Sequence, residues 1–285
     1  MNRVTRHSPA KINVSLRVGA RRTDGFHEIE SLIVRVGLFD ELTFTPRDDS
    51  GIEIVCDDAS SPTDRRNLAA QAAAALRSAA GITQAGVTIH LRKRIPAGAG
   101  MGGGSSDAAT TLVALNKMWN CGLNAHALES IAAEIGSDVP LFLHDSPCVV
   151  TGRGECVRDL ATPIRGWVAL LLSSVTCDTA RVYAAFDRIT APARGAAAVW
   201  NEATSADALM ERCFNDLEPA AFNAHPELDR IARAVAEATG VRVRMTGSGS
   251  GLFRLFDRRE DADEFARRAA SAASLRTEVA ELLCD

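Results

Sequence analysis

The sequence predicts an α+β fold in two domains, one over residues 1–160 and the other over residues 161–285. Strand-like and helix-like segments follow one another without the regular alternation that a doubly wound α/β sheet requires. A joint at 163–166, bounded by Pro163 and Gly166, separates two groups of apolar segments. The length of 285 residues is sufficient for one large domain or two small ones.

The elements of the first half follow from hydrophobic periodicity. Residues 11–18 alternate apolar and polar side chains, which predicts a half-buried strand whose exposed face carries Lys11 and Asn13. The turn signal Asp24-Gly25 comes next, and Asp64 is a candidate helix cap. The expected strands are 31–36, 41–45, 52–55, 86–92 and, with its turn, 148–155; the expected helices are 67–79, about 106–119, 124 to near 136, and a short element at 137–143.

The second half begins with the apolar run 167–172. Tyr183, the only tyrosine of the chain, lies in a segment that is typical of an amphipathic helix. Segment 191–197 is rich in proline, glycine and alanine, which predicts a surface connection. The remaining expected helices are about 205–213, 226–238 and 259–273, and the expected strands are 241–245, 252–256 and 278–282.

The overall composition narrows the function classes. A net charge of −4 and a pI of about 5.9 argue against nucleic acid as the partner. The longest apolar run is too short to span a membrane, and the N-terminus lacks an apolar signal core. Seven cysteines without a C-x-x-C pair indicate thiols in a reducing cytoplasm. We therefore expect a cytoplasmic protein that acts on a small molecule, as a monomer or a homodimer.

The most informative segment is a glycine-rich stretch at 95–107. It follows a strand-like run and precedes a helix-like run, and five of its glycines fall within seven residues. Glycine lets the backbone approach a ligand closely, and a helix N-terminus presents unpaired N–H groups. Together they predict a phosphate-binding loop, whereas a tight turn needs only one or two glycines. The residues expected to bind the nucleotide are Pro96, Gly98, Gly100, Gly102, Gly103, Gly104, Ser105 and Ser106.

Two well-known phosphate loops do not describe this stretch. Gly98-x-Gly100-x-x-Gly103 matches the dinucleotide pattern, but no acidic residue lies between Asp107 and Glu129, where that pattern needs one. A Walker A loop also fails, because no Gly-Lys-Ser/Thr follows the glycines. The stretch therefore represents a third type of phosphate loop.

Two further polar segments, 8–13 and 245–253, complete a pattern with the glycine stretch. Pro9-x-x-x-Asn13, the loop from Pro96 to Ser106 and the glycine turn from Thr246 to Gly251 occur in this order. This combination resembles the GHMP kinase superfamily and extends over nearly the whole chain. The resemblance implies a ribosomal protein S5 domain 2-like N-terminal domain and a ferredoxin-like C-terminal domain. It also implies ATP and Mg²⁺ as cofactors.

Five shorter motifs narrow the resemblance to one subfamily. They are Pro9-Ala-Lys-Ile-Asn13, Arg22-Thr-Asp-Gly-Phe-His-Glu28, Gly136-Ser-Asp-Val-Pro140, Gly152-Arg-Gly-Glu155 and Asn215-Asp-Leu-Glu218. Together they resemble the 4-diphosphocytidyl-2-C-methyl-D-erythritol kinases of the non-mevalonate isoprenoid pathway, which phosphorylate the 2-hydroxyl of their substrate. Two departures are Phe26, where the family usually has tyrosine, and Met101, where leucine is commoner.

The resemblance implies a role for two charged residues. Asp138 is the expected general base, because a carboxylate within hydrogen-bond reach can accept the proton of an alcohol. Lys11 is its expected partner, which keeps the carboxylate ionised and orients the alcohol. From spacing alone, the favoured readings are an N-cap for the element that contains Pro140 at Asp138 and an exposed strand lysine at Lys11, and only the resemblance reverses them.

The resemblance also implies the acceptor site. Phe26 and Tyr183 are expected to stack on the cytosine, and stacking contributes roughly 1–3 kcal/mol per base. His27 is expected to bond to the edge of the base, although it also fits a satisfied surface histidine. Asn67 is expected on the adenine side and is equally readable as a helix start. The remaining expected substrate contacts are Asn13, Thr246, Gly247, Ser248 and Gly249, while the metal ligands are left open.

Three other functions are compatible with parts of the sequence. The chain could be a GHMP kinase for a different alcohol. It could instead be a nucleotide-binding sensor on the same fold that has lost catalysis, although Lys11 and Asp138 argue against this. A dinucleotide-dependent oxidoreductase fits Gly98-x-Gly100-x-x-Gly103 but lacks the acidic residue and the following strand.

Overall fold

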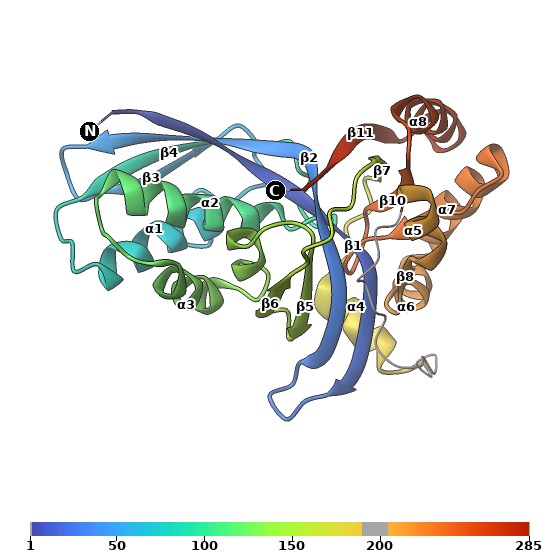
Figure 1. The fold of residues 1–285 in the computed structure, drawn as a ribbon, viewed down its shortest axis with the longest axis horizontal. Helices are drawn as coiled ribbons and strands as arrows, with labels where there is room; N and C mark the ends of the chain where they lie inside the picture. Colours follow the sequence, from blue (N-terminus) through green and yellow to red (C-terminus); the bar gives the residue numbers. More distant parts are fainter. Residues whose placement is uncertain (1, 190–204, 285) are drawn as a thin grey trace.

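A long antiparallel hairpin, β1 (Val4–Arg21) and β2 (His27–Arg47), runs across the first half of the molecule and along its border with the second half (Figure 1). The computed structural model describes residues 2–189 and 205–284, so the expected connection at 191–197 lies outside the described residues. β2 is one continuous strand, and the prediction of separate strands at 31–36 and 41–45 is therefore wrong. Its middle is paired with β1, and buried Asp40 there accepts hydrogen bonds from the backbone N–H groups of Arg94 and Ile95.

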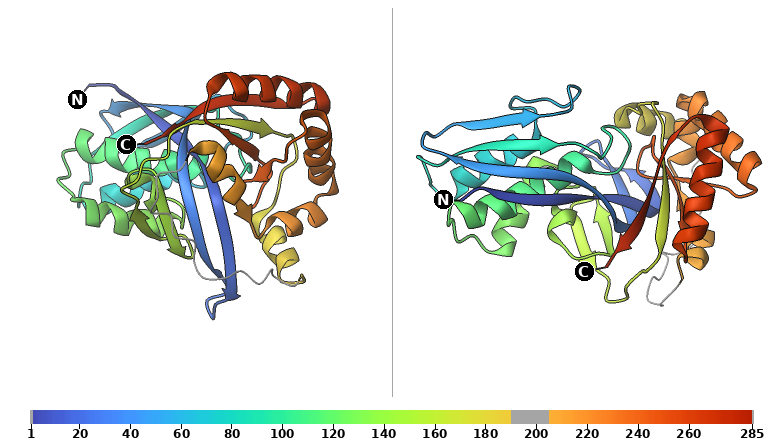
Figure 2. Two further views of the ribbon diagram at one scale, coloured as in Figure 1. Left: turned by 45° about the vertical axis from the view of Figure 1, so that its right-hand side comes forward. Right: turned by 90° about the horizontal axis from the view of Figure 1, so that it is seen from above.

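The first half of the chain is built on β2. Its C-terminal part pairs with β4 (Gly86–Arg92), which pairs in turn with β3 (Ile52–Cys56). Its N-terminal part pairs with β5 (Cys148–Gly152), which is followed by β6 (Cys156–Asp159). Helices α1 (Leu68–Ala79), α2 (Gly103–Met118) and α3 (Ala125–Ile135) cover one face of this sheet, and the short η1 (Pro140–Leu143) follows (Figure 2).

Helix caps agree with the sequence in one place and differ in another. Asn124 caps α3 by accepting from the N–H of Ala127, which confirms the expected start of that helix. Asp64 does not cap α1, because its carboxylate is bonded to Arg66. Asn67 is the cap, since its side-chain oxygen accepts from the N–H of Ala69 at 2.9 Å.

The second half forms a four-stranded antiparallel sheet of β7 (Trp167–Leu172), β9 (Arg244–Met245), β10 (Leu252–Phe256) and β11 (Arg276–Leu283). Its order, β11-β7-β10-β9, is the fourth, first, third and second strand along the chain, which fits the expected ferredoxin-like arrangement. β9 is shorter than the expected strand at 241–245. The helices are α4 (Thr179–Phe186), α5 (Ala206–Arg212), α6 (Glu218–Ala224), α7 (Pro226–Thr239) and α8 (Arg259–Ala273).

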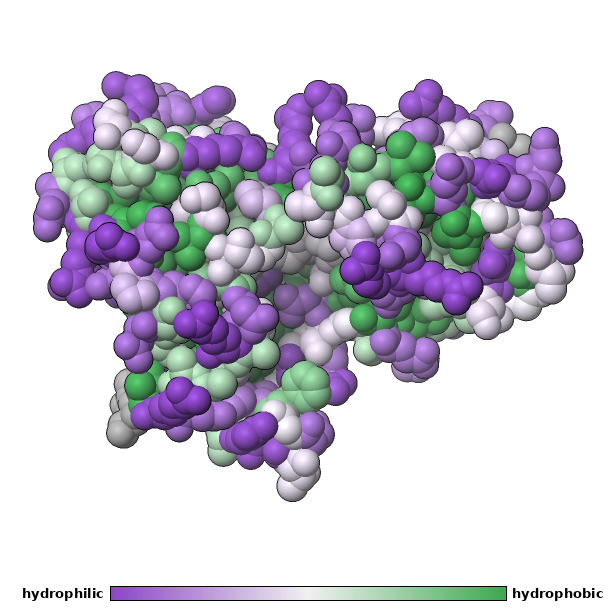
Figure 3. Space-filling model, turned by 180° about the vertical axis from the view of Figure 1, so that it is seen from behind, coloured by the Kyte–Doolittle hydropathy of each residue, from purple (hydrophilic) through white to green (hydrophobic). Residues whose placement is uncertain are grey.

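The two halves share one apolar cluster around β1. Ala10, Ile12 and Val14 pack there with Met101 of the glycine stretch and with residues of β7, β10 and β11. The opposite face of β1 is also buried, so the prediction of a half-buried strand is wrong: Lys11 and Asn13 are only 3% and 5% exposed. The surface is hollowed where the halves meet (Figure 3). None of the helices in the described residues is long and apolar enough to cross a membrane.

Candidate active site

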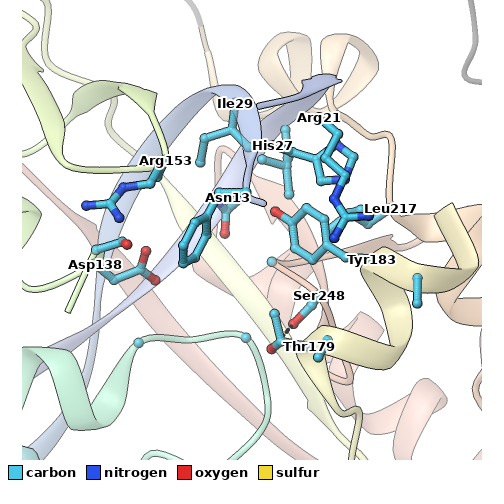
Figure 4. A pocket seen from close by; sticks show the side chains of 18 of the residues that line it. Asn13, Arg21, His27, Ile29, Asp138, Arg153, Thr179, Tyr183, Leu217 and Ser248 are labelled. Atoms are coloured by element: carbon cyan, nitrogen blue, oxygen red, sulfur yellow. Dashed lines mark hydrogen bonds between the residues drawn. The ribbon is translucent and has the colours of Figure 1, made fainter. Parts of the chain in front are cut away.

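Two cavities meet at the glycine stretch, which forms a wall of each. The larger one has a volume of about 660 Å³ and is lined by residues from both halves of the chain (Figure 4). The smaller one has a volume of about 320 Å³ and lies over the stretch and the start of α1. Gly100 and Gly102 line both cavities. A group bound on the loop in the smaller cavity is therefore close to the larger one.

The loop conformation depends on glycine at several positions. Gly98, Gly100 and Gly102 have φ values of 69°, 69° and 71°, in the left-handed region that other residues rarely adopt. A Cβ at Gly100 would lie 2.3 Å from the carbonyl oxygen of Thr246. α2 begins at Gly103, three residues before the expected start, so Gly103 and Gly104 belong to its first turn. The N-terminus of α2 and its unpaired N–H groups thus lie at the smaller cavity, as an anion site requires.

The other residues expected at the nucleotide have different surroundings. Pro96 and Ser105 line the smaller cavity. Asn67 lines it too, but its side chain also caps α1 and donates to the carbonyl of Pro62, so the helix-start reading is confirmed. Ser106 is fully buried, and its hydroxyl has no hydrogen-bond partner among the described residues.

Lys11 and Asp138 meet on the wall of the larger cavity. The Nζ of Lys11 lies 3.9 Å from Oδ2 of Asp138 and donates to Oδ1 of Asn13 at 2.6 Å. Burial lowers the pKa of Lys11, and the Asp138 carboxylate opposes this shift. The cap of η1 is Val139 and no side chain bonds to that helix end, so the N-cap reading of Asp138 is wrong. The carboxylate of Asp138 is instead 43% exposed to the cavity.

Asn13 and Thr246 connect the first polar segment with the last. The backbone N–H of Asn13 donates to the hydroxyl of Thr246 at 3.0 Å, and its Nδ2 donates to Ser31. Thr246 is fully buried behind the cavity wall. Gly247 and Ser248 line the larger cavity, whereas Thr246 and Gly249 do not. Asn13 therefore orients Lys11, and Thr246 holds the glycine turn against β1.

Three aromatic side chains, those of Phe26, His27 and Tyr183, line the larger cavity. Phe26 is 51% exposed and Tyr183 projects from α4; both line the cavity. His27 is buried against Tyr183, with ring centroids 5.4 Å apart. Its ring nitrogens already lie 3.0 Å from the carbonyl of Gly19 and 3.0 Å from Asp187. A bond from this ring to a base therefore stays a prediction, and the exposed faces are those of Phe26 and Tyr183.

Two arginines in the larger cavity were not expected from the sequence. Arg153 lies on the same side as Asp138, and Arg21 lies near Tyr183 on the other side (Figure 4). The guanidinium of Arg153 lies 5.0 Å from the centre of the Phe26 ring. Arg153 could have been found from the sequence, because it is part of the motif Gly152-Arg-Gly-Glu155. With Lys11, these side chains make the cavity suitable for an acceptor that carries negative charge.

A buried charge cluster lies under the smaller cavity. Lys93 donates to Asp40 and, at 2.6 Å, to Asp107, which also accepts from Ser8 at 2.5 Å. Burial raises the pKa of Asp107 to about 6; Lys93 opposes this shift and Asp40 adds to it. The cluster joins β1, β2, the end of β4 and α2, so it fixes the start of α2. The sequence contained no local signal for it, because its members are up to 99 residues apart.

We expect Asp107 to make the stability of the fold depend on pH. Its folded pKa lies above its ordinary value of 3.8, so its contribution is present below about pH 4 and is lost as the pH rises through about 6. The loss corresponds to about 3 kcal/mol in the free energy of unfolding. Asp107→Asn should remove this dependence. Urea unfolding between pH 4 and 7.5 measures it, with the exposed Asp48→Asn as control; equal pH slopes in wild type and Asp107→Asn would contradict the prediction.

Comparison with known proteins gives one consistent family. Residues 67–146 match the GHMP kinases N terminal domain, and residues 201–274 match the GHMP kinases C terminal domain. A 4-diphosphocytidyl-2-C-methyl-D-erythritol kinase of Bacillus cytotoxicus is 39% identical over 250 residues, which cover 87% of this chain and 86% of that protein. The corresponding kinase of Bacillus subtilis is 36% identical over 255 residues and covers 89% and 88%.

Solved structures agree with this relationship. The crystal structure of a 4-(cytidine 5'-diphospho)-2C-methyl-D-erythritol kinase superposes with a TM-score of 0.77 at 33% identity, over 98% of this chain and 99% of that one. A homoserine kinase from Cytophaga hutchinsonii has a TM-score of 0.74 at 19% identity, over 100% and 95% of the two chains, and so shows the fold alone. The expected two-domain fold is thereby confirmed, while the boundary between residues 160 and 161 stays a prediction.

Proposed function

Because the chain belongs to the 4-diphosphocytidyl-2-C-methyl-D-erythritol kinase family of the GHMP kinases, we propose that it transfers the γ-phosphate of ATP to the 2-hydroxyl of 4-diphosphocytidyl-2-C-methyl-D-erythritol. The observation that carries this proposal is the loop shared by the two cavities. A phosphoryl donor on the loop faces an acceptor in the larger cavity. Phosphoryl transfer requires such positioning more than it requires covalent chemistry by the protein.

The proposed reaction assigns the proton to Asp138. The acceptor oxygen forms a bond to the γ-phosphorus, the bond from that phosphorus to the β,γ-bridging oxygen breaks, and ADP leaves. Asp138 accepts the hydroxyl proton, because its exposed carboxylate lies in the acceptor cavity. Lys11, 3.9 Å away, forms an ion pair with that carboxylate and lies against the loop, where a Cβ at Gly102 would be 3.2 Å from its Cγ.

The acceptor is held by its two chemically different ends. The exposed faces of Phe26 and Tyr183 suit a cytosine, and the loss of the usual tyrosine hydroxyl at Phe26 leaves stacking unchanged. Arg21 and Arg153 supply positive charge for the diphosphate. Gly247 and Ser248 line the same cavity and are the proposed contacts of the methylerythritol part. We place this reaction in the cytoplasm, in agreement with seven free cysteines.

Magnesium fits the nucleotide side of the site. The described residues contain no group of three His, Cys, Asp or Glu side chains that would hold a metal. Mg²⁺ in kinases needs only one or two protein oxygens besides phosphate and water. Among the described residues, the buried hydroxyl of Ser106 has no hydrogen-bond partner, and the adjacent Ser105 lines the smaller cavity, so these two residues would hold the ion. Bound there, Mg²⁺ supplies neutralisation of the charge on the transferred phosphoryl group.

A substrate comparison tests the proposed function. Purified protein with Mg²⁺-ATP should phosphorylate 4-diphosphocytidyl-2-C-methyl-D-erythritol and should show little turnover with homoserine, mevalonate or galactose. Product formation is measured by ³¹P NMR, which also identifies the oxygen that is phosphorylated. Preference for another alcohol would contradict the proposed acceptor, and nucleotide binding without transfer to any alcohol would favour a sensor.

A further inference from the structure

The motif Asn215-Asp-Leu-Glu218 has no role in the reaction described so far. It comprises the end of β8 (Phe214–Asn215) and the start of α6. In the structure it lies beside β1 of the first half, with which β8 pairs. Asn215 and Asp216 are only 5% and 3% exposed. Buried polar groups are costly unless they are hydrogen-bonded, so the partners of these side chains indicate what the motif does.

Asn215 is bonded to the start of the glycine turn 246–251, on both sides of Thr246. Its Nδ2 donates to the carbonyl oxygens of Met245 and Gly247, both at 2.8 Å. Its Oδ1 accepts from the backbone N–H of Leu217 at 2.9 Å. Both donor hydrogens are therefore used on the turn, and the two bonded carbonyls flank Thr246. Glu218 adds a third bond at the same place, because its Oε2 accepts from the N–H of Met245 at 2.9 Å.

The other side of the motif is bonded to β1. Oδ2 of Asp216 accepts from the N–H of Val18 at 3.1 Å, and the N–H of Asp216 donates to the carbonyl of Leu16 at 2.9 Å. β8 pairs in parallel with β1 at the same position. The motif therefore fixes the glycine turn relative to the strand that carries Lys11.

The glycine turn is in turn bonded to the phosphate loop. The N–H groups of Ser250 and Gly251 donate to the carbonyls of Gly98 and Ala99 at 3.2 and 3.1 Å. The two segments pack so closely that a Cβ at Gly247 would lie 2.9 Å from the carbonyl oxygen of Gly100. A shift of the turn would therefore move both a wall of the acceptor cavity and the loop that holds the phosphates.

We propose that Asn215 is a positioning residue for phosphoryl transfer, which holds the turn 246–251 so that the phosphate loop and the acceptor wall keep their distance from Lys11. Asn215 does not line either cavity, so it acts through the turn and not on a substrate. Loss of Asn215 is expected to lower the rate strongly even if the turn moves little, because a misplacement of about 1 Å can cost about 100-fold in rate. This role rests on the proposed phosphoryl transfer.

Asn215→Ala tests the role, with Asn116→Ala as matched control. Asn116 also bonds to backbone through both ends of its amide, to the N–H and carbonyl of Leu123, and it does not line either cavity. Both variants should lose stability. Only Asn215→Ala should lower kcat, by about 10- to 100-fold, and raise KM for the acceptor. Asn215→Ser, which keeps one donor, should be intermediate and is used if the alanine variant does not fold.

Hydrogen exchange provides a readout that needs no acceptor. Mass spectrometry of the two variants should show faster exchange in peptides 98–102 and 245–251 of the Asn215 variant and wild-type exchange there in Asn116→Ala. The proposal is overturned if these peptides exchange as in wild type, or if the Asn215 variant loses stability while kcat and KM stay normal. The exchange result is independent of the identity of the alcohol, so it separates a failure of this role from a failure of the proposed acceptor.

Discussion

Replacement of Asp138 by asparagine is expected to lower kcat by about 10²- to 10⁴-fold, because an amide cannot accept the proton of the acceptor hydroxyl. The amide keeps the shape of the side chain, and the carboxylate makes no bond to the end of η1. The thermal midpoint should therefore stay near that of wild type. KM for ATP should change little, since Asp138 lines the acceptor cavity and not the nucleotide cavity.

The control is the same substitution at Asp159. This residue has a similar exposure, 50% against 43% for the side chain of Asp138, and it pairs with His144 outside both cavities. Asp159→Asn should keep wild-type kcat. Single-turnover kinetics with saturating ATP separate the chemical step from product release. A near-normal rate for Asp138→Asn would show that this carboxylate does not accept the proton, and that the protein catalyses the reaction by positioning the substrates.

Lys11→Met should show a loss in the same direction. The ammonium lies 3.9 Å from Oδ2 of Asp138. Its removal leaves the carboxylate of Asp138 without this partner and leaves Oδ1 of Asn13 without its strongest donor. The double variant should lose little more than Asp138→Asn alone, because residues that act as a unit are not additive.

The glycine stretch and several helix ends could be predicted because their signals are local. The glycines of the stretch and the cap Asn124 act within a few residues; the structure has the glycines along the smaller cavity and Asn124 at the start of α3, whereas α2 starts earlier than expected and Ser106 is fully buried. The burial of Lys11 could not be predicted, because the residues that cover its face come from distant parts of the chain. Alternation along β1 reports only that two kinds of side chain alternate, not that both faces are covered.

Long-range hydrogen bonds account for most of the remaining differences. Asp40 in the middle of β2 bonds to residues 54 and 55 positions later, which no local pattern reveals. The ion pairs of Lys93 with Asp40 and with Asp107 also join segments that are not adjacent in the sequence. Arg153 belongs to the motif Gly152-Arg-Gly-Glu155, but its position in the larger cavity depends on the pairing of β5 with β2. The motifs thus predict which side chains carry the chemistry of the site, whereas the contacts that position these side chains are tertiary and cannot be predicted from local patterns.

Replacement of Gly100 by alanine is expected to abolish tight nucleotide binding and to lower kcat/KM by about 100-fold or more. The residue has a φ of 69°, which costs an L-residue about 1–3 kcal/mol. Its new Cβ would lie 2.3 Å from the carbonyl oxygen of Thr246 and 3.1 Å from that of Gly249. Backbone atoms on both sides of the contact have to move, so the phosphate loop and the glycine turn separate.

Gly104→Ala is the matched control within the same loop. Its Cβ would meet only Leu68, at an ordinary distance of 3.6 Å, and the position is already helical. Alanine there keeps the backbone N–H group at the start of α2 and has a higher helix propensity than glycine. Calorimetric titration with a non-hydrolysable ATP analogue should therefore give wild-type affinity for Gly104→Ala and a large loss for Gly100→Ala. Equal affinities would mean that the loop tolerates the displacement and that the approach of Thr246 to Gly100 has no part in holding the nucleotide.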